Sequence, residues 1–406
     1  MYPDWPEEGV PLLPLPRCIG PTLKPFDFQG PQEIEFLEYL GEGLHAHVVK
    51  VKIHGQIYAL KLFRFCFDDD WNGYASDPKD LEEMTRLSSF SEPFNAECRA
   101  FGRLQEAGRT ELAVQCFGYV LLDEKHERAL HSQLRGYNDT EIKFNGNADV
   151  CSQFEFPYCR GRFVHTTKSG KPPPIRGILK EFGQGNEDLR KRNARKILQD
   201  VIKMQQLGMV QLDVAHRQLI NGKHADFSST ITTPHYRLNL ELNIKLTPQL
   251  RVALEFEAFQ LSISDYWEFD DMIYEWNDEH EDPKDHLFVY AFSRKWGSRG
   301  EPRYNLRSTP ERDRVYTYVD PRTYNWKYYV AKQRPPGEIQ GGEKPRQKLD
   351  AKPPKWWLFD TRSAVAAKMR RSTQWSTSIH WVCENRRFVP VIGKGSTVSR
   401  FYGPPA

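Results

Sequence analysis

The chain has 406 residues, of which 39% are hydrophobic and 27% charged, enough to bury the core of one large domain or two ordinary ones. The formal net charge is +3, which argues against a protein built wholly to bind nucleic acid. Seven scattered cysteines contain no CxxC pair, so we expect reduced thiols in the nucleus or cytoplasm rather than disulfides or a zinc site. The amino-terminal segment lacks the pattern of a secretory signal, and no run is apolar enough to span a membrane.

The first part of the chain predicts an arm followed by strands and a helix. Residues 1–30 are proline-rich and favour an extended arm. The alternating runs IEFLEYLGEG, HVVKVKIHG and QIYALKLFRF predict three antiparallel strands, the last two joined at His54 and Gly55. After a polar loop, SEPFNAECRAFGRLQEAG predicts a helix capped near Ser91 and ended by Gly108, and LAVQCFGYVLL predicts a buried strand.

The middle and end of the chain predict two more helices and a tail. Residues 123–174 are polar and predict an insertion, and the next segment, RGILKEFGQG, predicts a strand. Apolar residues at helical spacing predict a helix over 187–207, and EFEAFQLSISDYWEFDDMIYEWNDEHE predicts another. Residues 331–406 predict a basic, proline-rich linker and tail, disordered over 331–355, with apolar segments from Trp356 onward that dock back on the domain.

Two glycines, Gly41 and Gly43, lie between the first two predicted strands in GEGLHAHVVKV. Glycines there allow backbone amides to approach a phosphate, but a tight hairpin requires glycines as well. A dinucleotide-binding motif fits less well than either, because that motif needs a helix after the glycines and here a strand follows. The turn and the phosphate-binding interpretations both remain open on the sequence alone.

Lys61 lies in the middle of the apolar strand YALKLF, so its ammonium group must reach water or meet an anion. Glu97 lies on the following predicted helix, within FNAECRAF. An ion pair between Lys61 and Glu97 would hold the lysine ready for phosphate oxygens. The alternative is an exposed lysine on the outer strand face and a solvated glutamate.

The stretch VQLDVAHRQLINGKHADFSS contains two aspartates that suggest phosphoryl-transfer machinery. Aligning His216 and Arg217 with an HRD triplet would put Gln218 in place of the aspartate. Taking Asp213 as the triplet aspartate fits better, because QLD then replaces HRD and Gln218 falls where the loop asparagine is expected.

A hairpin is predicted to bring the two aspartates of this stretch together. Asn221 and Gly222 favour a type I′ turn between Leu219-Ile220 and the segment that follows. That turn would place Asp226, in a DFS triplet, beside Asp213. The turn also accounts for the short separation between the two aspartates.

The order of these features resembles the eukaryotic protein-kinase-like fold over about residues 34–280: glycine loop, strand lysine, helix glutamate, aspartate loop and Asp-Phe turn. SDYWEFDDMIYEW resembles the Asp-x-Trp pattern of the central helix of the larger lobe, here Asp265 and Trp267, and RGILKEFG resembles the strand that leads to the hinge. The resemblance implies an α+β, two-lobed fold. Its parts would be a smaller lobe and hinge over 31–186 and a larger lobe over 187–330 that diverges after residue 290.

The resemblance also implies roles for individual residues. Asp213 would be the catalytic base, and Gln218 and Asp226 would bind metal. ATP and Mg²⁺ are the implied cofactors. Nucleotide binding is implied for the residues of the glycine loop, the strand lysine and its partner, and the hinge: Gly41, Gly43, Lys61, Glu97 and Glu181.

A closer resemblance is to fungal proteins of the Fta-two subunit family of the Sim-four inner-kinetochore complex. The phrases that carry it are IEFLEYLGEGLHAHVVKVKI, PFNAECRAFGRLQEAG, LAVQCFGYVLLDEKHERA, DVAHRQLINGK and DFS, and it extends to about residue 325. It implies protein partners in a kinetochore complex and a nuclear location.

Several positions depart from an active kinase. The HRD histidine and arginine are replaced by Gln211 and Leu212, and the lysine expected two residues after the base by Ala215. The metal-binding asparagine is Gln218, which is one methylene longer, and the glycine of the DFG triplet is Ser228. Beyond residue 290 the sequence is strand-like where further helices of the larger lobe are expected. These departures favour a pseudokinase.

Two functions therefore remain open from the sequence. The first is a non-catalytic kinase-fold scaffold that acts through protein contacts, with a kinetochore role implied by the family. The second is an ATP- and Mg²⁺-dependent kinase acting on a protein or small molecule, so the sequence leaves enzymatic activity undecided. A weaker third option is a DNA contact through the basic tail, between KPRQK and KMRR.

Overall fold

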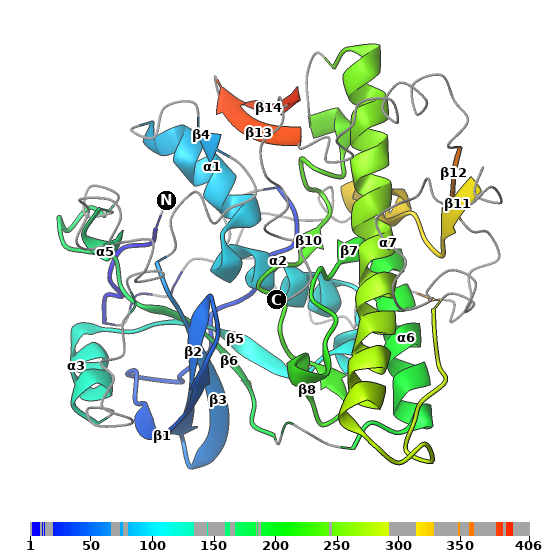
Figure 1. The fold of residues 1–406 in the computed structure, drawn as a ribbon. Coiled ribbons are helices and arrows are strands. Elements are labelled where there is room, and N and C mark those ends of the chain that lie inside the picture. The colour runs from blue at the N-terminus through cyan, green and yellow to red at the C-terminus, as the bar shows by residue number, and fades with distance from the viewer. Residues whose placement is uncertain are drawn as a thin grey trace. The chain divides into compact units, whose positions relative to one another are not determined.

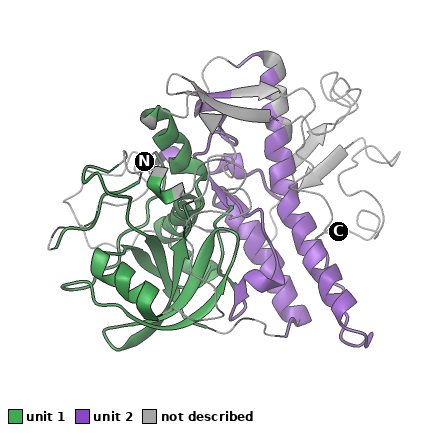
Figure 2. Cartoon of the chain, turned by 60° about the vertical axis from the view of Figure 1, so that its left-hand side comes forward, with its two compact units in different colours: residues 1–185, 223–229, 342–346 green, residues 186–222, 230–341, 347–406 purple. Residues whose placement is uncertain are grey.

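The computed structural model divides the chain into two compact units (Figure 2). Unit 1 comprises 1–185, 223–229 and 342–346, and unit 2 comprises 186–222, 230–341 and 347–406. Within these bounds the structure describes residues 2–8, 10, 12, 19–65, 74–75, 80–133, 144, 159–162, 167–183, 185, 188–242, 246–291, 314–328, 348–349, 357–360, 379–384 and 387–392.

Unit 1 is built around a five-stranded antiparallel sheet with the order β1-β2-β3-β6-β5 (Figure 1). The first three strands follow one another along the chain, as the alternating sequence pattern predicts, and the turn from β2 to β3 has positive φ at both His54 (49°) and Gly55 (79°). The strands are β1 (Glu35–Glu42), β2 (Ala46–Ile53), β3 (Gln56–Phe63), β5 (Cys116–Leu121) and β6 (Arg176–Glu181), and a short β4 (Tyr74–Ala75) lies outside this sheet.

Two consecutive helices, α1 (Leu81–Ser91) and α2 (Pro93–Glu106), precede β5. The predicted capped helix that begins at Pro93 is confirmed, but the cap is Glu92 and not Ser91, since the Glu92 carboxylate accepts from Asn95 N. Helix α1 was not predicted. Its first turn is polar, but an apolar stripe follows. Met84, Leu87 and Phe90, which are spaced three residues apart, are buried.

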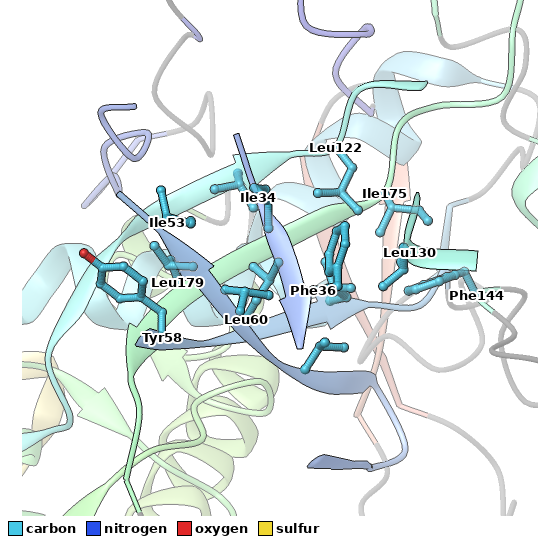
Figure 3. Close-up of a cluster of buried hydrophobic side chains, with 14 of the residues drawn as sticks. Ile34, Phe36, Ile53, Tyr58, Leu60, Leu122, Leu130, Phe144, Ile175 and Leu179 are labelled. Atoms are coloured by element: carbon cyan, nitrogen blue, oxygen red, sulfur yellow. The ribbon is translucent and has the colours of Figure 1, made fainter. Parts of the chain in front are cut away.

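Other short elements complete unit 1. They are η2 (Thr110–Leu112) and, within the predicted insertion, α3 (Glu124–Gln133) and α5 (Cys159–Arg162). The described part of the insertion contributes to the core, since Leu130 and Phe144 join the cluster of buried side chains shown in Figure 3. That cluster also holds residues from the strands, including Phe36, Leu60 and Leu179.

The described parts of the amino-terminal arm pack onto unit 1. Phe26 N donates to Tyr119 O at 2.8 Å, so this part of the arm runs along β5. A side chain at Gly118 would meet the backbone of Phe26 at 2.6 Å, so only glycine permits this close approach. At the start of the chain, Tyr2 is buried in the core cluster and packs edge-on against Phe65, with ring centroids 5.3 Å apart.

Unit 2 is organised by two long helices, α6 (Lys191–Gln206) and α7 (Pro248–Glu279), which lie side by side (Figure 1). Buried Gln205 joins them, because its amide donates to Ser262 O at 2.7 Å and its carbonyl accepts from Tyr266 at 2.7 Å. Helix α7 begins at Pro248, after the Thr247 cap, and so starts earlier than the sequence pattern predicts.

Short strands and turns make up the rest of the described part of unit 2. They are β7 (Met209–Val210), η4 (His216–Gln218), β8 (Leu219–Ile220), β10 (Ile231–Thr232), η5 (Leu240–Leu242), β11 (Arg314–Thr317), η6 (Pro321–Thr323), β12 (Trp357–Asp360), β13 (Ile379–Glu384) and β14 (Arg387–Ile392). The antiparallel pairs are β7 with β10, β11 with β12, and β13 with β14.

The carboxyl-terminal part was predicted to dock back on the domain, and Phe388 does so. It is 2% exposed and stacks on Tyr236, with ring centroids 4.2 Å apart.

The strand-like pattern near residue 315 is confirmed by β11. The segment 331–355 that was predicted to be disordered lies, except for 348–349, outside the described residues, as does most of the basic tail. Within the described part of the chain, no helix combines the length and apolar character needed to cross a membrane.

Candidate functional site: a buried charge network and an aspartate loop

The predicted ion pair between the strand lysine and the helix glutamate is present in unit 1. Lys61 Nζ on β3 lies 2.8 Å from Glu97 Oε2 on α2. The same ammonium group lies 2.6 Å from Oδ1 of Asp226. Lys61 is 7% exposed and Glu97 is fully buried, so the alternative of a surface lysine with a solvated glutamate is excluded.

A second buried lysine joins this network and was not predicted. Lys180 on β6 forms an ion pair with the other carboxylate oxygen of Glu97, and its Nζ also donates to Ala225 O at 2.7 Å. The sequence did contain a signal for it. Like Lys61, Lys180 follows an apolar stretch of a strand (RGILKE), where an ammonium group needs an anion.

The charges of the network fix one another's protonation states. Burial alone would lower the pKa of Lys61, but the carboxylates of Asp226 and Glu97 outweigh burial and raise it. Burial alone would raise the pKa of Asp226, but Lys61 and Lys180 hold it well below its usual range. Lys61 and Asp226 are therefore both charged near neutral pH.

The Asp-Phe-Ser segment is tied to the rest of unit 1 by its side chains. Phe227 is buried and packs edge-on against Phe101 of α2, with ring centroids 5.1 Å apart. Ser228 N donates to Asp226 Oδ1 at 2.9 Å. These contacts orient the aspartate toward Lys61.

The glycine loop meets this segment through His45, which the sequence did not single out. His45 Nδ1 lies 3.1 Å from Ser228 Oγ, and burial together with the charge of Lys61 lowers the pKa of His45 to about 4, so the imidazole is neutral. The two glycines are explained by the turn: Gly41 has φ 144° and Gly43 N donates to Ala46 O at 2.9 Å. Phosphate binding by Gly41 and Gly43 stays a prediction.

Glu181, the predicted hinge residue, has a structural role at the end of β6. Its Oε2 accepts from Gln115 N at 3.0 Å and lies 3.3 Å from Lys223 Nζ. The carboxylate thus connects β6 to the segment before β5 and to β9 (Lys223–His224). Nucleotide binding by Glu181 stays a prediction.

In unit 2, both carboxylate oxygens of Asp213 are engaged. Arg217 Nη2 donates to Oδ1 at 2.7 Å and Gln218 Nε2 donates to Oδ2 at 2.7 Å. The contact between Arg217 and Asp213 lies at the surface, because the two side chains are 67% and 34% exposed. The guanidinium also supplies a positive charge beside Asp213, which Ala215 cannot provide.

Helix α7 holds the backbone that carries Asp213. Buried Asp265 accepts from Gln211 N at 3.1 Å, from Leu212 N at 2.9 Å and from Gln205 Nε2 at 3.0 Å. These bonds fix Leu212 in a left-handed conformation, with φ 60°, which a leucine rarely adopts. Burial raises the pKa of Asp265 to about 6, although the three donors act to lower it.

A second carboxylate of α7 supports the residue after Asp213. Glu268 Oε2 accepts from Val214 N at 2.9 Å. Burial raises the pKa of Glu268 to about 8, and the negative charges of Asp265 and Asp213 add to this, whereas Val214 N and Arg217 oppose it. Glu268 therefore retains a proton at neutral pH more readily than an exposed glutamate does.

The predicted turn between the two aspartates has the expected backbone conformation. Asn221 and Gly222 have φ of 51° and 65°, and positive values at both positions are what a type I′ turn requires. Asp213 belongs to unit 2 and Asp226 to unit 1. Their closeness in space, and with it a shared site for Asp213, Gln218 and Asp226, stays a prediction.

The environment of Asp226 does not fit the divalent metal ion that the kinase resemblance implies. Mg²⁺ requires several oxygen ligands in near-octahedral geometry. At Asp226, Oδ1 already accepts from Lys61 and from Ser228 N, and Lys180 adds a second nearby positive charge. Among the described residues, no cluster of three or more His, Cys, Asp or Glu side chains could hold a metal ion.

Comparison with known proteins identifies the family. The family model described as kinetochore Sim4 complex subunit FTA2 matches residues 11–231, which is more than half of the 406 residues. The chain therefore belongs to this family. The matched region includes every candidate site residue from Gly41 to Asp226. No curated protein matches the chain.

Proposed function

We propose that the chain is a subunit of the kinetochore Sim4 complex, built on a two-lobed kinase-like scaffold that acts through protein contacts rather than phosphoryl transfer. The observation that carries the proposal is the family membership over residues 11–231. A role as a complex subunit entails protein partners and a nuclear location.

Support for the kinase-like scaffold comes from the arrangement of unit 1. A lysine in the middle of a strand of an antiparallel sheet pairs with a glutamate on a helix, and an Asp-Phe segment contributes a second carboxylate to the same ammonium group. Such a pair is the arrangement that positions phosphates in kinases. In unit 2, Asp265 of α7 binds the backbone beside Asp213, which agrees with the proposed correspondence of α7 to the central helix of the larger lobe.

Support for a non-catalytic role comes from the groups that phosphoryl transfer needs and that are altered here. That chemistry depends on metal ions and positioned cations that neutralise the developing charge on the phosphoryl group. Asp226 is already neutralised by Lys61 and Lys180, and Gln218, the expected metal ligand, donates instead to Asp213 Oδ2. A scaffold needs only the shape that these contacts maintain.

One observation favours the alternative of an ATP- and Mg²⁺-dependent kinase. The guanidinium of Arg217 lies against Asp213. It supplies a cation beside the expected base, in place of the lysine that Ala215 replaces. The test is a thermal shift with ATP and Mg²⁺, compared between the parent chain and Lys61→Ala. A shift that Lys61→Ala abolishes supports nucleotide binding, and no shift in the parent chain counts against the alternative.

The test of the proposal itself is association with the kinetochore in living cells. We expect the full-length chain, fluorescently tagged at its carboxyl terminus, to form foci that coincide with a centromere marker. Immunoprecipitation of the tagged chain should recover other subunits of the complex. A diffuse signal, with no such subunits recovered from cells that contain the marker, would contradict the proposal.

A further inference from the structure

Lys180 places an ammonium group in a buried position, which is unfavourable unless ion-pair or hydrogen-bond partners compensate for the loss of water. It is 6% exposed and lies on β6, an interior strand of the five-stranded sheet between β3 and β5. Its Nζ contacts Glu97 and Ala225 O. Removing a charge of this kind from water costs several kcal/mol, and only well-placed partners offset that cost.

The two partners of Lys180 belong to the parts that form the charge network. Glu97 is the carboxylate that also binds Lys61, and Ala225 immediately precedes Asp226. One ammonium group therefore bridges helix α2 and the Asp-Phe-Ser segment from the side of β6. Lys61 bridges the same two parts from β3, through Glu97 and Asp226.

The resulting network is balanced in charge. Lys61 and Lys180 contribute two positive charges, and Glu97 and Asp226 two negative charges. Without Lys180 the network would carry one net negative charge, and its carboxylates would attract a cation from solution. With Lys180 present, a divalent ion at Asp226 would face two ammonium groups and only two carboxylates.

We propose that Lys180 is a built-in cation that takes the place of a divalent metal ion in unit 1. It is a positioning residue: it holds Glu97 and the backbone before Asp226 in place, so that this part of the fold is assembled without metal or nucleotide. The inference deepens the proposed non-catalytic role and rests on it in treating the network as the counterpart of a kinase nucleotide site.

A purely structural role for Lys180 makes a different prediction about metal ions. If the lysine only contributes an ion pair to the fold, its removal lowers stability equally with and without metal. If it replaces a metal ion, its removal uncovers a cation site at Asp226 and Glu97. A divalent cation should then restore part of the lost stability.

The experiment measures the thermal midpoint of the full chain with and without millimolar MnCl₂. We expect no response from the wild-type protein, and a rise of roughly 5 °C for Lys180→Met, since a ligand that binds only the folded state raises its midpoint. The rise should vanish in Lys180→Met combined with Asp226→Asn. Lys50→Met is the matched control, because Lys50 lies on β2 of the same sheet and pairs with Glu38 outside the network.

Two results would overturn the inference. One is a folded Lys180→Met protein whose midpoint Mn²⁺ does not raise. The other is a wild-type protein that binds Mn²⁺, detected by electron paramagnetic resonance, at a site that Asp226→Asn removes. If Lys180→Met does not fold, the measurement of Mn²⁺ binding to the wild-type protein still tests the inference. Neither measurement involves the kinetochore, so failure of the inference and failure of the proposed complex role are distinguishable.

Discussion

Replacement of Glu97 by glutamine tests the energetic importance of the charge network. Glu97 is fully buried and is shared by Lys61 and Lys180, whose side chains are 8% and 7% exposed. Glu97→Gln keeps the size of the side chain but leaves two buried ammonium groups with one carboxylate. Breaking a buried ion pair from one side costs about 3–5 kcal/mol. Because about 1 kcal/mol shifts the midpoint of a unit of this size by roughly 2–4 °C, we expect a fall of about 10 °C.

The assay is urea unfolding followed by tryptophan fluorescence, together with a thermal melt. Glu35→Gln is the matched control, because Glu35 pairs with Lys52 at 3.1 Å on the exposed surface of the same sheet and such pairs contribute less than about 1 kcal/mol. Adding Lys180→Met to Glu97→Gln removes the excess positive charge and should recover a large part of the loss. The reasoning is refuted if Glu97→Gln costs no more than Glu35→Gln.

Three further predictions concern the core, pH and the thiols. Tyr2→Ala should lower the free energy of unfolding by about 3–5 kcal/mol, as loss of a buried aromatic ring does. Urea unfolding that matches wild type would contradict the packing of Tyr2 in the core cluster. The pKa of Glu268 is raised to about 8, so the folded state holds an extra proton between the ordinary glutamate pKa and pH 8. Stability should therefore fall as pH rises through that range, by up to about 1.4 kcal/mol per pH unit. Glu268→Gln should remove this dependence between about pH 6 and pH 8, above the pKa of about 6 of Asp265. Glu275→Gln, an exposed change on the same helix, should leave the dependence in place, as urea titrations from about pH 5 to about pH 9 would show. Burial raises the pKa of Cys98 well above its usual value and that of Cys116 to about 12, so iodoacetamide at mildly alkaline pH should modify these two thiols only after unfolding. Rapid modification of Cys98 or Cys116 in the native protein, identified by peptide mass spectrometry, would count against this.

The strands and the main helices could be predicted because their patterns are local. Alternation of apolar residues located β1 to β3, and helical spacing located α2, α6 and α7. Helix α1 was not predicted, because its first turn is polar and directly follows a polar loop. The docking of the arm on β5 could not be predicted, since it depends on the close approach that Gly118 permits.

Within the candidate site, the pairing of Lys61 with Glu97 was predictable from one charged residue in an apolar strand. The apolar strand before Lys180 indicates that its ammonium group needs an anion, but not which one. The contacts of His45 and Asp265 could not be predicted, because each depends on which distant backbone groups or side chains meet its own side chain. Sequence spacing alone carries no information on such contacts. The kinase-like arrangement of the two units, and with it a common site for Asp213 and Asp226, remains a prediction.

The most direct test of the central claim is the recovery of kinetochore complex subunits with the tagged chain in which Asp213 is replaced by asparagine. The replacement side chain would keep an oxygen for Arg217 or Gln218 but could not serve as a base, and the wild-type Asp213 side chain is 34% exposed, so the fold should be preserved. The account predicts that Asp213→Asn recovers the same subunits in the same amounts as wild type. Loss of those subunits from a protein that is folded and equally abundant would contradict a role carried by protein contacts alone.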